Sequence, residues 1–170
     1  MIDEKKINYL LSTRKNILLL LKEGSFDSYI INLISFSRGH IGLISNKFPF
    51  LSSLNIIENV CLGLMYNQNI SLKNSIKKIH DYIKMINMED CLWLRKEQIN
   101  EEQLVKAYFL RCVANGNSVI FMDSPKYEWI KIVLQCIERT NLYQNVWIST
   151  SLANKDLYND LKFDVIEVSD

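Results

Sequence analysis

Residues 99–125 read I-N-E-E-Q-L-V-K-A-Y-F-L-R-C-V-A-N-G-N-S-V-I-F-M-D-S-P. Asn100 and Gln103 stand three residues apart, which is the spacing of a capping box at the start of a helix. Gly116 stands where such a helix would end, because glycine readily adopts the left-handed conformation of a helix terminus. Four apolar residues and an aspartate follow, Val119 to Asp123. The stretch predicts a helix from Glu101 to Asn115 that leads directly into a buried strand.

The same alternation of apolar strands and amphipathic helices continues over the rest of the chain. Isoleucines recur at spacings of three and four from Ile76 to Ile86, and apolar residues do so from Trp129 to Ile137, so both segments should be helical. Strands that alternate with helices predict an α/β domain with a parallel sheet, in which most strands are covered on both faces. The strand candidates are Asn16 to Leu21, Ile41 to Ser45, Val119 to Asp123, Asn145 to Thr150 and Phe163 to Val168.

Composition limits the classes of protein that the chain can represent. Its 170 residues, 48% of them hydrophobic, suffice for one compact domain. A net charge of +1 gives no basis for binding nucleic acid through bulk charge. The longest apolar run, Ile17 to Leu21, is far shorter than a membrane span. We therefore expect a cytoplasmic chain that reaches a membrane only through a partner.

The four cysteines are expected to be buried free thiols. They stand far apart in apolar surroundings, without the paired spacing of a zinc site or a redox motif. The sequence predicts no metal site. The cysteines are Cys61, Cys91, Cys112 and Cys136.

The spacing within residues 99–125 resembles the ATP-binding cassette (ABC) family, in which L-S-G-G-Q opens a helix that leads into the Walker B strand and D-E-P. Gln103 falls on the glutamine of that motif and, without a gap, Asp123 falls on the aspartate and Pro125 on the proline. Upstream, I-G-L-I-S-N-K-F-P-F-L-S-S-L-N-I-I-E-N-V-C-L-G-L, Ile41 to Leu64, resembles the Q-loop and the element that follows it. The resemblance implies a P-loop-NTPase-like core in a single domain, residues 1–170, with a reduced helical subdomain at about residues 51–97.

The positions that handle ATP in this family carry other residues here. If N-I-L-L-L-L is the first core strand, G-S-F-D-S-Y stands where G-S-G-K-S-T would be, and Asp27 replaces the phosphate-binding lysine. Asn46 replaces the Q-loop glutamine, Ser124 the catalytic glutamate and Ser151 the switch histidine. A carboxylate at about 4 Å from one phosphate charge costs about 4 kcal/mol at an effective dielectric constant near 20. The vestigial nucleotide-binding positions are therefore Gly24, Ser25, Asp27, Ser28, Asn46, Asn100, Gln103, Asp123, Ser124 and Ser151.

These departures predict a pseudo-ATPase without catalytic residues, for which neither ATP nor magnesium is expected as a cofactor. The leading hypothesis is a noncatalytic transporter subunit that docks on a membrane permease or on an active ABC ATPase, at the inner face of the membrane. Two alternatives remain: the ATP-binding half of a heteromeric ATPase with a composite site, and a soluble protein-interaction module. We expect partner binding through an exposed apolar surface formed by Phe48, Phe50, Leu51 and Leu54.

Overall fold

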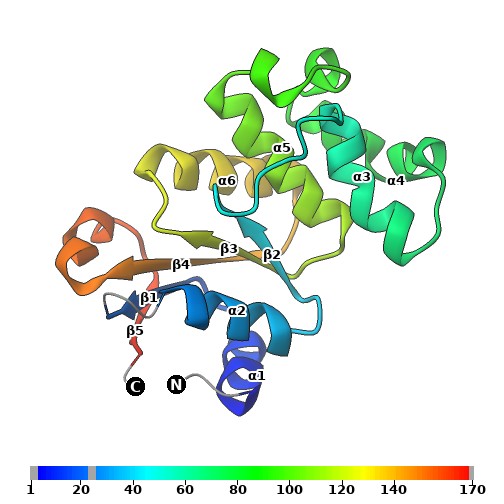
Figure 1. Cartoon of the computed structure of the whole chain (residues 1–170). Coiled ribbons are helices and arrows are strands. Elements are labelled where there is room, and N and C mark those ends of the chain that lie inside the picture. Colours follow the sequence, from blue (N-terminus) through cyan, green and yellow to red (C-terminus); the bar gives the residue numbers. More distant parts are fainter. Residues whose placement is uncertain (1–3, 23–25, 169–170) are drawn as a thin grey trace.

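The chain folds around one parallel sheet, whose strand order is β2-β3-β4-β1-β5 (Figure 1). The computed structural model describes residues 4–22 and 26–168, with the backbone alone described for Phe26 and Asp27. The strands are β1 (Ile17–Leu21), β2 (Ile41–Ile44), β3 (Val119–Asp123), β4 (Asn145–Ser151) and β5 (Asp164–Glu167). The helices are α1 (Glu4–Thr13), α2 (Phe26–Phe36), α3 (Ile56–Asn67), α4 (Leu72–Met85), α5 (Glu101–Ala114) and α6 (Tyr127–Thr140), with 3-10 turns η1 (Glu89–Cys91), η2 (Lys96–Gln98) and η3 (Leu152–Tyr158).

The strand predictions are confirmed, because each predicted strand is present and its ends differ by at most one residue. Strands β1 to β4 are largely buried, as expected for strands covered on both faces. Strand β5 differs, since it lies at the edge of the sheet and leaves Val165 49% exposed. The predicted parallel α/β architecture is therefore correct.

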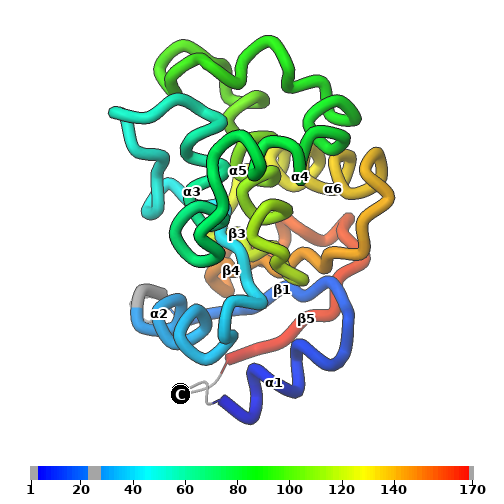
Figure 2. The backbone as a smooth tube through the Cα atoms, turned by 90° about the vertical axis from the view of Figure 1, so that its right-hand side faces the viewer, coloured from blue at the N-terminus to red at the C-terminus, as the bar shows by residue number. Residues whose placement is uncertain are grey.

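Helices cover both faces of the sheet. Figures 1 and 2 show α3, α4, α5 and α6 on one side and α1 and α2 on the other. Successive side chains of a strand point to opposite faces, so Leu18 and Leu20 of β1 pack under the larger helical layer, whereas Ile17, Leu19 and Leu21 pack against α1 and α2. None of the described helices is long and apolar enough to cross a membrane.

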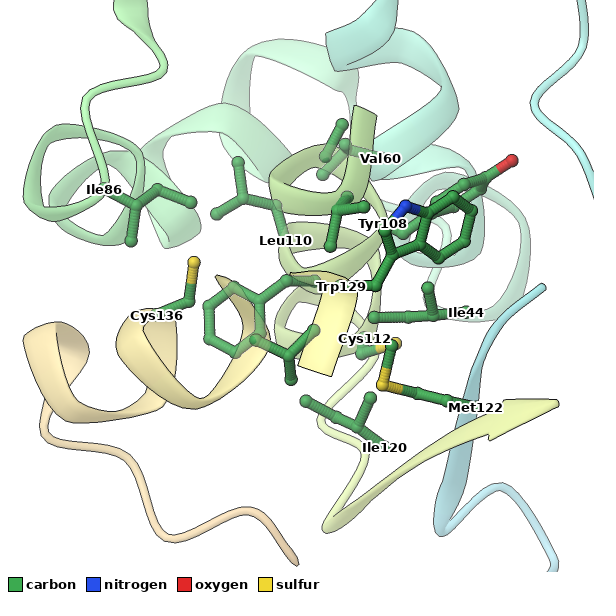
Figure 3. Packing of buried hydrophobic residues seen from close by; sticks show 14 of the residues in the cluster. Ile44, Val60, Ile86, Tyr108, Leu110, Cys112, Ile120, Met122, Trp129 and Cys136 are labelled. Atoms are coloured by element: carbon green, nitrogen blue, oxygen red, sulfur yellow. The ribbon is translucent and has the colours of Figure 1, made fainter. Parts of the chain in front are cut away.

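Helix α5 is the centre of the larger layer. Its residues Tyr108, Leu110 and Cys112 belong to the same hydrophobic cluster as Ile120 and Met122 of β3, and Figure 3 shows Cys112 beside Met122. The helices of residues 51–97 contribute their buried side chains to the same cluster, so no separate core divides them from the sheet.

The cysteines are buried free thiols, as predicted. Burial raises the pKa of the Cys112 thiol to about 12, so this side chain behaves as an apolar group of the core at neutral pH.

The segment expected to bind a partner is divided between the core and the surface. Phe48 and Leu51 are 41% and 51% exposed, and Leu54 is half-buried. The expectation that Phe50 belongs to an exposed surface is wrong, because its side chain is only 2% exposed. Its ring meets the ring of Tyr108 edge-on, with centroids 4.6 Å apart, and the Arg111 guanidinium lies 5.0 Å from its centroid. Phe50 therefore anchors the chain between β2 and α3 to helix α5.

Because of this division, two matched truncations should have different effects on the free energy of unfolding. Phe50→Ala should lower the free energy of unfolding by about 3 to 5 kcal/mol, because it removes a buried ring from a close-packed site. Phe48→Ala removes an exposed ring and should stay within about 0.5 kcal/mol of the unsubstituted protein. Urea denaturation midpoints of the two variants provide the comparison. Equal midpoints would contradict the assignment of Phe50 to the core.

Candidate functional site at the carboxyl edge of the sheet

Asp123 ends strand β3, and only 8% of its side chain is exposed. Its Oδ1 atom accepts hydrogen bonds from the hydroxyl groups of Ser149 at 3.1 Å and Ser124 at 3.5 Å. Its Oδ2 atom lies 3.0 Å from the Nζ atom of Lys47. A carboxylate with so little contact with water is stabilised by a nearby cation and by hydrogen-bond donors. Lys47 and the two serines supply them.

Lys47 reaches Asp123 from the β2–α3 loop, residues 45–55. Strands β2 and β3 pair with Ile44 opposite Met122, so this loop leaves the sheet immediately beside Asp123. A tight turn begins the loop: the Phe48 amide donates to the Ser45 carbonyl at 3.2 Å, and the Lys47 amide donates to the Ser45 hydroxyl at 3.2 Å. The turn thus brings the lysine side chain back toward the end of β3.

Ser124 follows Asp123 in a left-handed backbone conformation, with a φ of 44°. Its amide donates to the Ser149 carbonyl at 2.9 Å, which holds the end of β3 against β4. The side chain is exposed. A serine hydroxyl does not accept a proton at neutral pH as a glutamate does, so Ser124 cannot act as the general base that this position holds in the resembled family.

The start of helix α5 satisfies its own polar groups. Asn100 Oδ1 accepts from the Gln103 amide at 2.9 Å, and Gln103 Oε1 accepts from the Asn100 amide at 3.0 Å, so the predicted capping box is confirmed. Glu101 Oε1 accepts from Lys126 Nζ at 2.6 Å and from Trp129 Nε1 at 2.8 Å. These donors lower the pKa of Glu101, which therefore carries its negative charge at the positive end of the helix dipole.

The structure brings together three of the ten predicted positions. Asn46, Asp123 and Ser124 line one pocket of about 330 Å³. Ser151 ends β4 opposite Leu21 of β1, at the same edge of the sheet. Asn100 and Gln103 begin α5, whereas Asp27 and Ser28 lie in the first turn of α2. Gly24 and Ser25 lie outside the described residues.

Three residues that the sequence reasoning did not assign to the site shape this pocket. Lys47 and Lys126 line it with one cation each, and Trp129 forms part of its wall. The sequence places Trp129 only in a predicted helix; its side chain is buried, and its indole nitrogen donates a hydrogen bond to Glu101. Figure 3 shows Trp129 beside the core residues of α5. The sequence places Lys47 next to Asn46, but no spacing along the chain indicates that its side chain reaches Asp123.

The described residues do not fit the magnesium ion that the family resemblance implies. Magnesium is held by oxygen ligands, usually carboxylates, and keeps several waters. The Oδ2 atom of Asp123 already contacts an ammonium group, which would repel a second cation. Asn46 adds only an uncharged amide. Within residues 4–22 and 26–168, no three His, Cys, Asp or Glu side chains are placed to hold a metal ion.

A second concave region lies beside the β2–α3 loop and is mainly apolar. One hollow of about 550 Å³ is lined by residues of the loop, α3 and α4, and a neighbouring hollow of about 420 Å³ is lined by residues of β2, the loop, α3 and α5. Leu51 and Leu62 line both. We call this region the loop surface; its apolar members are Ile41, Leu43, Phe48, Pro49, Leu51, Leu54, Leu62, Met65, Tyr66 and Leu72.

The sequence has curated relatives among ATP-binding proteins of transporters. It is 30% identical over 88 residues to the methionine import ATP-binding protein MetN of Helicobacter acinonychis, across 51% of this chain and 26% of that protein. It is 26% identical over 125 residues to the macrolide export ATP-binding/permease protein MacB of Hahella chejuensis, across 67% of this chain and 19% of that protein. The chain therefore spans about a quarter or less of the curated relatives it matches. No protein-family model matches it.

Solved structures share the fold over almost the whole chain. The ATP-binding cassette MJ0796, in a dimeric post-hydrolysis state bound to ADP and phosphate, matches with a TM-score of 0.62 and 18% identity, over 92% of this chain and 82% of that one. CbiO1 of Clostridium perfringens, part of the ABC transporter complex cbiONQ, matches with a TM-score of 0.60 and 11% identity, over 81% and 67% of the two chains. In sequence the chain is similar to ATP-binding proteins of transporters, and its fold is that of ABC ATP-binding cassettes.

Proposed function

We propose that the chain is an ABC-ATPase-like subunit that hydrolyses no ATP and that docks, through the loop surface, on a membrane permease or on an active ABC ATPase. The observation that carries the proposal is the contrast between two regions that both include residues of the β2–α3 loop. The pocket at Asp123 has its charged groups paired within the chain, whereas the loop surface leaves Phe48 and Leu51 exposed beside two hollows.

Electrostatics support the first half of the proposal. ATP with magnesium needs cations and backbone amides aimed at its phosphates. In this pocket Lys47 pairs with Asp123 and Lys126 pairs with Glu101, so a phosphate group would have to compete with a carboxylate for each lysine. Asp27, which the family alignment puts in the place of the phosphate-binding lysine, adds a further negative charge to the sequence after β1.

Burial supports the second half of the proposal. Monomeric proteins rarely expose large contiguous apolar patches, and such patches with polar rims are typical of interaction sites. Leu51 is 51% exposed and Tyr66 is 82% exposed, and both line the larger hollow, with Ser53 and Glu58 as polar neighbours. An apolar segment of a partner, inserted there, would bury these side chains.

The named relatives indicate the kind of partner. MetN is named an import ATP-binding protein and MacB an export ATP-binding/permease protein, so one of these two relatives combines an ATP-binding part with a permease. The composite-site alternative is less favoured, because Glu101 and Glu102 place negative charge at the start of α5, where a partner's phosphate would have to approach.

The first prediction of this proposal concerns nucleotide binding. Millimolar ATP with magnesium should leave the melting temperature of the isolated chain unchanged, because ligand binding to the folded state is required for stabilisation. A ligand at 100 times its dissociation constant would add about 2.7 kcal/mol, which thermal-shift measurements readily detect. An intact ABC ATPase serves as the positive control. A magnesium-dependent rise in melting temperature that saturates with ATP would contradict the proposal.

The second prediction concerns docking. Tagged protein recovered from detergent-solubilised membranes of its native host should carry a permease or an ABC ATPase subunit with it. Leu51→Asp, which puts a charge into the hollow, should reduce that recovery by about tenfold or more, as at an interface hot spot. Tyr143→Asp is the matched control, because Tyr143 is 91% exposed and lines neither hollow. Equal recovery with both variants, or no transporter subunit with the unsubstituted chain, would overturn the docking surface.

A further inference from the structure

We infer that the Lys47 ammonium group takes the place of a divalent cation at the end of β3 and thereby fastens the β2–α3 loop to the sheet. The loop surface would then be held in its docking conformation without nucleotide and without metal. The inference deepens the proposed function. It rests on that function only in one respect, which is that the loop surface serves for docking. The fastening itself is a property of the isolated chain.

The geometry around Asp123 identifies the lysine as an internal counter-ion. Asp123 belongs to β3, which pairs with both β2 and β4, so its carboxylate is held by the sheet itself. Its Oδ1 atom is oriented by Ser149, which is fully buried, and its Oδ2 atom is the one that meets Lys47 at 3.0 Å. The Lys47 side chain is 48% exposed, whereas that of Asp123 is 8% exposed. The rigid, buried partner is therefore the carboxylate, and the lysine is the group brought to it by the loop.

Two further side chains hold the same loop by hydrogen bonds to its backbone. We call these two contacts and the Lys47–Asp123 pair the three clamps of the loop. Arg111 of α5 donates to the carbonyls of Leu43 at 3.1 Å and Phe48 at 3.4 Å, and its guanidinium lies 5.0 Å from the ring centroid of Phe50 and 4.8 Å from that of Tyr108. At the far end, the side-chain amide of Asn59 accepts from the Leu51 amide and donates to three carbonyls of the loop.

Each of the three clamps holds a different part of the loop. Arg111 and Asn59 fix its middle and its end, and Lys47 fixes its start. Phe48 and Leu51, the most exposed apolar members that the loop contributes, lie between the first clamp and the last. Lys47 is the clamp that reaches the pocket where the resembled family holds its metal. In this chain the carboxylate at the end of β3 is therefore a structural partner of the loop.

Hydrogen–deuterium exchange of the isolated chain tests the inference. Lys47→Met keeps the aliphatic length of the side chain and removes its charge, and it should speed amide exchange in residues 46–51 by about tenfold or more, as expected for losing a bond to a charged group. Exchange in α4 should not change. Lys126→Met is the matched control, because Lys126 forms an ion pair of the same kind in the same pocket without contacting the loop. If the Lys47→Met and Lys126→Met proteins exchange alike over residues 46–51, the inference is wrong.

Two additional measurements keep the test decisive. If Lys47→Met yields too little folded protein, the double variant Lys47→Met/Asp123→Asn removes both charges together and should loosen the same residues. In the unsubstituted chain, millimolar Mn²⁺ should cause no saturable broadening of the Ser124 and Ser149 amide resonances, and such broadening would show that the carboxylate prefers a metal to the lysine. The exchange and Mn²⁺ experiments use the isolated chain, whereas the docking proposal is tested by the recovery of a transporter subunit. The two proposals can therefore fail independently, and the failures are distinguishable.

Discussion

The structure at the carboxyl edge of this sheet depends on a single buried carboxylate. Asp123 is too far removed from water to stand alone, and the chain compensates it with Lys47 and two serine hydroxyls. That requirement draws the start of the β2–α3 loop onto the end of β3. Arg111 and Asn59 hold the remainder of the loop. The position of the loop surface therefore depends on the contact between Lys47 and Asp123 at the start of the loop.

The polar groups at the start of α5 are likewise paired within the chain. Asn100 and Gln103 cap each other, and Glu101 binds Lys126 and Trp129. Two of the places that handle nucleotide in the resembled family, the end of β3 and the start of this helix, thus have their polar groups paired within the chain. The hydrophobic layers around α5 and β3 need none of those groups, which explains how the fold can persist with a different set of residues at its edge.

The sequence was most informative where local chemistry determines structure. Capping residues and Gly116, whose φ is 71°, delimit α5, and apolar runs located all five strands, because these signals act over a few residues. Helix α1 was not predicted, since only Ile7 and Leu10 mark its buried face. The burial of Phe50 was also missed, because it depends on Tyr108 and Arg111, far along the chain. The Lys47–Asp123 pair joins residues 76 positions apart, a contact that spacing along the chain does not encode.

The central claim is that Lys47 holds the place of a cation at Asp123, and an experimental structure tests it most directly. Crystals of the isolated chain grown with ATP and magnesium, at a resolution that distinguishes an ammonium group from a hydrated metal ion, would give the answer. The account predicts Lys47 Nζ within hydrogen-bonding distance of the Asp123 carboxylate, with neither metal nor nucleotide at the carboxyl edge of the sheet. A magnesium ion on Asp123, with Lys47 turned away toward solvent or toward a phosphate group, would contradict it.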